Sequence, residues 1–348
     1  MDARVQKAIQ LAEALKKQPG AVPWQPDKPW PQRYYSWDTE DEAWLPVSSN
    51  TTNSVAKMPS DISALAVYSW NVDLMLPFAE SRMEAALAHL GQLLSQASSA
   101  STTAVVINLQ ECVPSDLITI SRQPWVRDGF YMTDLDASAW GSWAYGTTTL
   151  VDKRLDVLSC FRVHYAKSNM ERDALFVDVS MPVARSTRAQ TLRLGNSHLE
   201  SLISDPPLRP PQVQIMGAYM HEAGVSAAVA TGDFNAIQPF DRTLHSDAGV
   251  KDAYLEQGGA EDSDGGYTWG QQAGRALRER FGCSRMDKAY FCGSLQLQSF
   301  ERFGADVEVR EEDRKQRDGL LSLGFEKAWV TDHLGIKAVF KFENAVRL

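Results

Sequence analysis

The chain has 348 residues, of which 44% are hydrophobic and 23% are charged, and its formal net charge is −9. This length and hydrophobic content suffice for one large core. The negative charge argues against a broad nucleic-acid-binding surface, which would need a basic stripe. It leaves open an enzyme that grips only the end of a nucleic acid, or a carboxylate-rich site neutralised by a cation.

Targeting signals and metal-binding cysteines are missing from the sequence. No apolar run is long enough to span a bilayer, and the N-terminus lacks the basic and then apolar order of a secretory signal. The four cysteines have no CxxC spacing, which predicts free thiols and disfavours a zinc site. We therefore expect a reduced intracellular protein, either nuclear or cytoplasmic.

The first 60 residues predict a helix followed by an extended arm. Residues 2–17 carry apolar side chains at helical spacing among Lys and Gln, which indicates an amphipathic helix. Residues 18–60 interleave prolines with Trp and Tyr, so long regular structure is excluded while packing is favoured. We expect an arm wrapped over the surface, or a peptide-like docking segment, with a linker at 48–60. The main domain is then predicted at 61–348.

From residue 65 onward the chain alternates between strand-like and helix-like segments. Apolar runs predict strands at 65–70, 104–109, 174–179, 190–195, 227–230, 285–291 and 335–342. Two further strands, at 143–151 and 155–165, are predicted to pair through a turn at Asp152-Lys153-Arg154. Helices are predicted at 82–96 and 210–223, and the charged run 311–318 is predicted as a solvated loop. Many strands with three or four helices indicate two stacked sheets with helices outside.

One predicted strand ends at Gly232-Asp233-Phe234-Asn235, which places a carboxylate and a carboxamide at its C-terminal edge. Asp233 can act as a base or a metal ligand. Asn235 points to the same side if the chain stays extended, and its amide both donates and accepts. An Asx turn that only closes the strand is the alternative for a single pair of this kind. Four other strand-like runs also end at polar residues, which favours a functional site.

The polar groups predicted at strand ends are of a kind suited to phosphoester chemistry. They are Asn71, Glu111, His198, Asp233, Asn235, Asp287, Asp332 and His333. Their oxygen donors favour Mg²⁺ or Mn²⁺, and such a cation beside histidines that donate to an anion is typical of a phosphodiester or phosphomonoester hydrolase. The chain has no GxxxxGK, GxSxG or HExxH motif, which disfavours a phosphate-loop enzyme, a serine hydrolase and a zincin. Taken singly, each residue has a structural alternative, such as a satisfied core histidine for His198.

Six short motifs occur in the order found in the endonuclease/exonuclease/phosphatase superfamily, which the chain resembles over residues 63–342. They are Trp70-Asn71, Leu109-Gln110-Glu111, Asn196-Ser197-His198-Leu199-Glu200-Ser201, Gly232-Asp233-Phe234-Asn235, Arg285-Met286-Asp287 and Thr331-Asp332-His333. Within the superfamily the chain looks most like the tyrosyl-DNA phosphodiesterases that act on 5′-phosphotyrosyl ends. Tyr267-Thr268-Trp269 adds to that likeness. The resemblance implies a four-layered α/β sandwich, with two mostly antiparallel sheets flanked by helices and a catalytic domain at 61–348.

The resemblance also implies Mg²⁺ as cofactor, with Mn²⁺ as an alternative, and it implies how the acidic residues act. Glu111 would hold the metal with Asn71 beside it, and Asp332 would support the metal or its water shell. Asp233 would orient and deprotonate the attacking water. Asn235 would fix the geometry of Asp233.

The resemblance also implies which residues contact the phosphate and the rest of the substrate. His198 and His333 would donate to the non-bridging phosphate oxygens as charge develops in the transition state. Asp287 would keep His333 positioned and charged. Trp269 would offer an aromatic face for stacking a base or a tyrosine, with core packing as its alternative.

The chain departs from the tyrosyl-DNA enzymes at three places. Ile237 stands where those enzymes carry an arginine, Thr331 replaces the usual serine before Asp-His, and Gly270 stands where an aspartate is typical. We therefore expect a monomeric, Mg²⁺-dependent phosphodiesterase that acts on 5′-phosphotyrosyl or related bonds at DNA ends. The alternatives are a hydrolase of another phosphoester, such as an RNA end, an inositol phosphate or a sugar phosphate, and a catalytically inactive binding protein.

Overall fold

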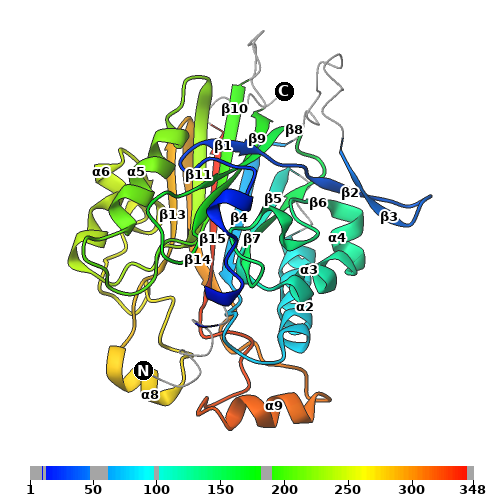
Figure 1. The fold of residues 1–348 in the computed structure, drawn as a ribbon, viewed down its shortest axis with the longest axis vertical. Helices are drawn as coiled ribbons and strands as arrows, with labels where there is room; N and C mark the ends of the chain where they lie inside the picture. The colour runs from blue at the N-terminus through cyan, green and yellow to red at the C-terminus, as the bar shows by residue number, and fades with distance from the viewer. Residues whose placement is uncertain (1–9, 11–12, 48–61, 98–101, 182–189, 343–348) are drawn as a thin grey trace.

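A computed structural model describes residues 10, 13–47, 62–97, 102–181 and 190–342. Within these ranges two sheets pack face to face and helices cover their outer faces, as Figure 1 shows. The predicted fold class, a four-layered α/β sandwich, is therefore confirmed. Most of the helix predicted at 2–17 and all of the linker predicted at 48–60 lie outside the described residues.

One sheet has eight strands in the order β14-β15-β4-β5-β7-β6-β2-β3. These strands are β2 (Tyr35–Asp38), β3 (Ala43–Pro46), β4 (Ala64–Asn71), β5 (Thr103–Cys112), β6 (Phe130–Met132), β7 (Gly146–Asp152), β14 (Leu295–Phe303) and β15 (Gly335–Phe342). The pair β4–β5 is parallel, and the other pairs of this sheet are antiparallel.

The second sheet has seven strands in the order β1-β8-β9-β10-β11-β13-β12. These strands are β1 (Pro29–Pro31), β8 (Val157–His164), β9 (Asp173–Met181), β10 (Gln190–Ser197), β11 (Val225–Asp233), β12 (Lys251–Asp252) and β13 (Asp287–Gly293). The pair β10–β11 is parallel, and the other pairs are antiparallel.

The helices form the two outer layers and a cap beyond the strand ends. The eight-stranded sheet is covered by α2 (Ala79–Ala97), α3 (Pro114–Ser121) and α4 (Pro124–Gly129), whereas α5 (Arg209–Met220) and α6 (Leu244–Asp247) cover the seven-stranded sheet. The other α-helices are α7 (Ala253–Glu256), α8 (Arg275–Phe281) and α9 (Arg314–Leu321). Figure 1 shows α8 and α9 beyond the lower ends of the strands. The prediction of three or four helices was too low, because helices of one or two turns leave no clear apolar period.

Period-2 alternation divides the apolar side chains between layers. In β4, Leu65 and Val67 lie in the core between the two sheets, whereas Ala66 and Tyr68 belong to the core beneath α2. Successive strand residues point to opposite faces, so a strand buried on both faces reads as a continuous apolar run. This explains why the sequence predicts β4 within one residue of its observed ends.

The predicted pairing of residues 143–151 with residues 155–165 was wrong. The strands exist, but β7 pairs with β5 and β6, whereas β8 pairs with β9 and β1 of the other sheet. The turn that begins at Asp152 therefore carries the chain from one sheet to the other. A short turn fits a hairpin and a crossover between stacked sheets equally well, so the local sequence does not decide between them.

The charged run at 311–318 was also predicted wrongly, as a loop, because most of it lies in helix α9. Leu320 at the end of α9 is buried against Trp329 and other apolar residues in a small satellite core. One buried face is enough to hold a helix whose other side chains are solvated. None of the described helices is both long enough and apolar enough to cross a bilayer.

The described part of the proline- and aromatic-rich segment, residues 18–47, is mostly extended, and it adds edge strands to both sheets. Pro29–Pro31 pairs with β8, whereas Tyr35–Asp38 pairs with β3 and, through Tyr35, with β6. Prolines are tolerated at these edge positions because they need not donate to a further strand.

Candidate active site

The inward face of several strands changes from apolar to polar towards one end of the sandwich. On β10, Leu192 and Leu194 lie in the core between the sheets, and Asn196 and then His198 follow at the same two-residue spacing. On β11, Asp233 ends a similar row of inward-facing residues. Because side chains alternate along a strand, the periodicity that builds the core also delivers polar groups between the sheets.

A layer of hydrogen bonds separates the core from these strand ends. The Asn108 Nδ2 donates to the Thr231 Oγ1 over 2.8 Å, and the Thr149 Oγ1 donates to the Asn108 Oδ1 over 2.8 Å. The Asn196 Nδ2 donates to the Thr148 carbonyl over 2.9 Å. The Asn108–Thr231 and Asn196–Thr148 bonds cross from one sheet to the other, so they fix how the two sheets sit beneath the polar groups, and the Thr149–Asn108 bond joins neighbouring strands of one sheet. No sequence motif marks this layer.

Gly232 allows β11 to approach β10 directly beside the candidate residues. A Cβ at this position would lie 1.8 Å from the Ser197 carbonyl oxygen, and the backbone φ is +154°. No side chain fits such a separation without a shift of the backbone.

Gly232→Ala is therefore expected to lower the free energy of unfolding by more than about 2 kcal/mol, measured by urea denaturation. Gly129→Ala is the matched control, because a Cβ there meets nothing within 4 Å. The control should stay within about 0.5 kcal/mol of the wild type. An equal, small effect of both substitutions would contradict the steric argument.

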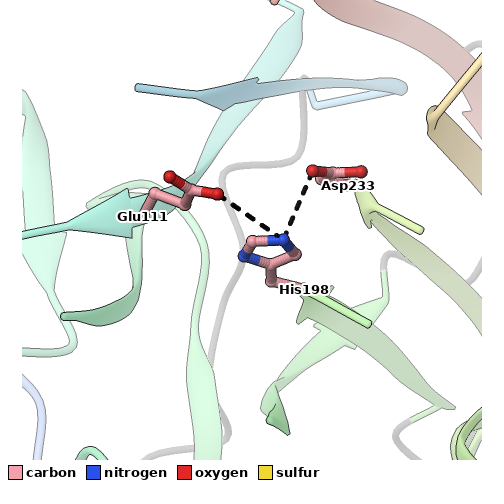
Figure 2. Close-up of side chains that lie close together, drawn as sticks. All are labelled: Glu111, His198 and Asp233. Atoms are coloured by element: carbon pink, nitrogen blue, oxygen red, sulfur yellow. Dashed lines mark ion pairs between the residues drawn. The ribbon is translucent and has the colours of Figure 1, made fainter. Parts of the chain in front are cut away.

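Hydrogen bonds and short charge contacts connect all eight polar residues predicted at strand ends: Asn71, Glu111, His198, Asp233, Asn235, Asp287, Asp332 and His333. Figure 2 shows the His198 ring between Glu111 and Asp233. Its Nε2 lies 3.3 Å from the Asp233 Oδ2 and 3.8 Å from the Glu111 Oε1. Residues from both sheets thus meet at one point.

Glu111 owes its position to an irregularity in β5. The pairing of β5 with β7 shifts register between Leu109 and Cys112, and Glu111 has a positive φ of 58°. Bulges of this kind re-aim a side chain at the edge of a sheet. The Glu111 carboxylate accepts from the Asn71 Nδ2 over 3.2 Å and from the Leu74 backbone N–H over 2.8 Å.

Asp233 is buried and is held by several donors. The Asn71 Nδ2 donates to its Oδ2 over 2.9 Å, and the Asn235 backbone N–H donates to its Oδ1 over 2.9 Å. The His333 Nε2 lies 3.7 Å from the same Oδ2 that faces His198. Burial alone would raise the pKa of the Asp233 carboxyl, but the nearby His333 and the hydrogen bond from His198 outweigh burial and hold the pKa well below its usual range. Asp233 is therefore ionised at neutral pH.

His333 is paired with the fully buried Asp287. The His333 Nδ1 and the Asp287 Oδ2 are 2.8 Å apart. Burial alone would lower the pKa of the His333 imidazolium, but Asp287 and Asp233 raise it well above its usual value. His333 therefore carries a positive charge at neutral pH and presents its Nε2 towards Asp233.

A buried arginine contacts the other histidine. The Arg172 Nη1 lies 2.6 Å from the His198 Nδ1, and Arg172 is 6% exposed. Arg172 lies just before β9 and precedes His198 by 26 residues along the chain. No motif marks Arg172, and it is not among the site residues predicted from the sequence.

The acidic side of the site holds more negative charge than its neighbours neutralise. Burial, together with Asp332 and Glu111, raises the pKa of Asp73 to about 8. The nearby Arg82 directs its N–H groups to the backbone carbonyls of the 72–77 loop and of Val330. Clustered carboxylates with this charge surplus fit a divalent cation that prefers oxygen ligands. Asp73 is not among the residues predicted at strand ends, although its place two residues after Asn71 was a usable signal.

Trp269 contacts this acidic side through its indole N–H, which donates to the Asp332 Oδ2 over 2.7 Å. The ring is half-buried and lies 6.5 Å, centroid to centroid, from the ring of Phe281, which is 57% exposed.

Ile237, which replaces the family arginine, donates its backbone N–H to Asp241 over 3.0 Å. Arg242, the nearest basic residue to Ile237 in sequence, pairs with the exposed Asp262.

The sequence profile of the Endonuclease/Exonuclease/phosphatase family matches residues 68–333, which include all of the candidate residues above. The chain belongs to this family. Its members share a phosphoesterase chemistry, to which a carboxylate, two imidazoles and a cluster of acidic oxygens are suited. A search of curated protein sequences finds no match.

Solved structures with the family fold include TDP2 from two animals. A truncated Caenorhabditis elegans TDP2 is 21% identical, with a TM-score of 0.56 over 80% of this chain and 97% of the other. D. rerio TDP2 complexed with a single-strand DNA product is 18% identical, with a TM-score of 0.56 over 80% and 99% of the two chains. A family member from Bacteroides vulgatus is 15% identical, with a TM-score of 0.54 over 81% and 100%. At these identities the likeness establishes the fold.

Proposed function

We propose that the protein is a Mg²⁺-dependent phosphodiesterase that hydrolyses 5′-phosphotyrosyl or related phosphodiester bonds at DNA ends. One observation carries the proposal. The His198 and His333 Nε2 atoms lie 3.3 and 3.7 Å from the Asp233 Oδ2, beside the acidic cluster of Asp73, Glu111 and Asp332. A base, two proton-bearing imidazoles and cation ligands thereby surround a common point.

Each residue then has a defined task. Asp233 is ionised, and Asn71 and the Asn235 backbone orient it, so that it accepts the proton of an attacking water. His198 and His333 turn their Nε2 atoms from Asp233 to the non-bridging phosphate oxygens when substrate enters. Asp287 keeps the His333 imidazolium charged and aligned as negative charge develops on those oxygens.

Glu111, Asp332 and Asp73 are the residues that would hold Mg²⁺. A bound Mg²⁺ neutralises phosphate charge and stabilises the leaving oxygen. Asn71 orients the Glu111 carboxylate by donating to it, and the Trp269 indole does the same for Asp332. We infer that this hydrogen-bonded frame limits how far the carboxylates move when charge enters or leaves the site.

Two features favour the end of a DNA strand as substrate. Trp269 and the exposed Phe281 offer aromatic surface next to Asp332, and unpaired bases stack on such surface. The net charge of −9 suits an enzyme that grips a strand end rather than a length of duplex. We infer action as a monomer in the nucleus or cytoplasm, with the catalytic residues in 61–348 and the arm in 1–60.

A second candidate is hydrolysis of another phosphoester, such as an RNA end, an inositol phosphate or a sugar phosphate. The observation that favours it is Ile237, which supplies no charge where tyrosyl-DNA enzymes carry an arginine. Arg242, the nearest basic residue in sequence, is paired with the exposed Asp262. A weaker hold on a DNA phosphate would follow.

The test is hydrolysis of a substrate panel in Mg²⁺, with Asp233→Asn as the blank. The panel contains a 5′-phosphotyrosyl oligonucleotide, a 3′-phosphotyrosyl oligonucleotide, an abasic duplex, single-stranded RNA and an inositol polyphosphate. Selective cleavage of the 5′-tyrosyl strand supports the proposal. Cleavage of another member alone assigns the second candidate, and no cleavage at all, with Mg²⁺ bound, would assign a binding protein that has kept the fold.

Removal of the cation is expected to abolish activity reversibly. EDTA should reduce turnover to the level of the Asp233→Asn blank, and added Mg²⁺ should restore it. Because a ligand of the folded state raises stability by mass action, Mg²⁺ should also raise the melting temperature of the wild type. Glu111→Ala should lose this thermal shift. An unchanged shift in Glu111→Ala would remove Glu111 from the metal site.

A further inference from the structure

The two histidines of the site have opposite partners at Nδ1. The His333 Nδ1 faces the carboxylate of Asp287 at 2.8 Å, whereas the His198 Nδ1 faces the guanidinium of Arg172 at 2.6 Å. A carboxylate oxygen only accepts, so the His333 Nδ1 must carry a hydrogen. A guanidinium N–H only donates, so the His198 Nδ1 must offer its lone pair.

The surroundings of Arg172 direct its hydrogen bonding to His198. Its Nη2 reaches only the Met170 sulfur, at 3.5 Å, and its Nε has no hydrogen-bond partner among the described residues. Within the described part of the chain, Arg172 forms no ion pair with a carboxylate, and the Tyr145 ring lies 5.4 Å from its Cζ. A buried guanidinium with so few partners makes its shortest polar contact, 2.6 Å, with the His198 ring.

We propose that Arg172 is a positioning residue that fixes the tautomer of His198, with the proton on Nε2. That proton then points to the Asp233 Oδ2, which lies 3.3 Å from Nε2 in the free enzyme, and to a phosphate oxygen in the complex. The tautomer is inferred from the Arg172–His198 hydrogen bond alone, whereas its role in catalysis rests on the proposed function. Arg172 thus orients the His198 ring by donating to its Nδ1, and Asp287 orients the His333 ring by accepting from its Nδ1.

An arginine suits this place for an electrostatic reason. Five carboxylates, those of Asp73, Glu111, Asp233, Asp287 and Asp332, already meet at the site. A further carboxylate behind His198 would add to their mutual repulsion, whereas a guanidinium orients the ring and contributes positive charge. Without Arg172, no partner requires a lone pair on the His198 Nδ1, so a proton can also occupy that atom. The ring also loses the contact that holds its Nε2–H towards Asp233 and the phosphate.

The direct test is nitrogen NMR of protein labelled with ¹⁵N in its histidine rings, recorded without metal and with Mg²⁺. The chain has six histidines, and the spectrum of His198→Gln identifies the signals of His198 by their loss. We expect an unprotonated Nδ1 and a protonated Nε2 in the wild type. Arg172→Met should admit a proton to Nδ1 in part of the molecules and give a mixed signal, and Arg172→Lys, which keeps an N–H donor, should retain the wild-type pattern in part.

Arg193→Met is the matched control. Arg193 is a buried arginine on β10, the strand that leads to His198, but it pairs with Asp178 and Glu222 on the outer face of the sheet. Its removal should lower stability and leave the His198 signals unchanged. If Arg172→Met does not fold, the wild-type spectrum decides alone, and a protonated His198 Nδ1 would overturn the proposal.

Kinetics supply a second readout once a substrate is known. Arg172→Met should lower kcat by about 10²-fold, the size of losing one oriented donor, with a smaller change in KM. Arg172→Lys should recover part of that loss. A normal tautomer in Arg172→Met would also overturn the proposal. Absence of turnover in the wild type, with the tautomer as expected, would instead count against the proposed function and leave the assignment of Arg172 standing.

Discussion

Replacement of Asp233 by asparagine is expected to lower kcat by about 10³-fold or more, within the range measured for loss of a general base. The amide keeps one oxygen, which can still accept from the Asn235 backbone, whereas its NH2 group replaces the oxygen that accepts from Asn71, so that one hydrogen bond is lost. The amide cannot take a proton from water at neutral pH. The measurement is steady-state hydrolysis of the best member of the substrate panel at saturating Mg²⁺.

Two controls isolate the chemical role of Asp233. Urea denaturation should give Asp233→Asn a midpoint close to that of the wild type, and its Mg²⁺-induced thermal shift should persist. Asp128→Asn, on the exposed surface of α4, should leave kcat unchanged. A rate for Asp233→Asn within a few-fold of the wild type would remove Asp233 from the mechanism.

His333→Ala is expected to lower kcat by about 10²-fold or more, the size of losing one donor to developing negative charge. The loss should be large because Asp287 keeps this imidazole charged in a buried site, where water does not readily replace it. His221→Ala, at the exposed C-terminal end of α5, is the matched control and should retain the wild-type rate. A wild-type kcat in His333→Ala would show that His333 does not contact the transition state.

Asp287→Asn separates the charge of His333 from its presence. The Asp287 carboxylate raises the pKa of the His333 imidazolium, so its removal should lower that pKa. The charged form is then lost at a lower pH, and the alkaline limb of the kcat profile should move towards neutral pH. An unmoved limb would mean that another group sets it.

Much of the fold follows from local pattern. Strands β4, β5 and β11 are buried on both faces, so their residues form apolar runs that stand out in the sequence. Because side chains alternate between the two faces, Asn71 and Asp233 lie at the ends of the rows of core residues that face the other sheet. Motif order and strand position together therefore indicated which polar residues lie at the candidate site.

Other features depend on contacts that local pattern does not encode. The sequence could not say that β7 and β8 join different sheets, because one short turn serves both topologies. It also gave no sign of helix α9, whose single buried leucine packs on a satellite core formed by distant residues. The bulge that aims Glu111 appears only once β5 is paired with β7.

By itself, then, the sequence determined the class of the fold, the family motifs and the residue types available for chemistry, since these depend on side-chain type and short-range spacing. Only the tertiary structure decided which partners those residues have. The Arg172–His198 and Asp287–His333 contacts join residues 26 and 46 positions apart, and the pKa of Asp73 is raised by burial and then by Asp332 and Glu111. Such contacts arise from the stacking of two sheets, and electrostatic interactions depend on distance and burial, which no single segment of the chain specifies.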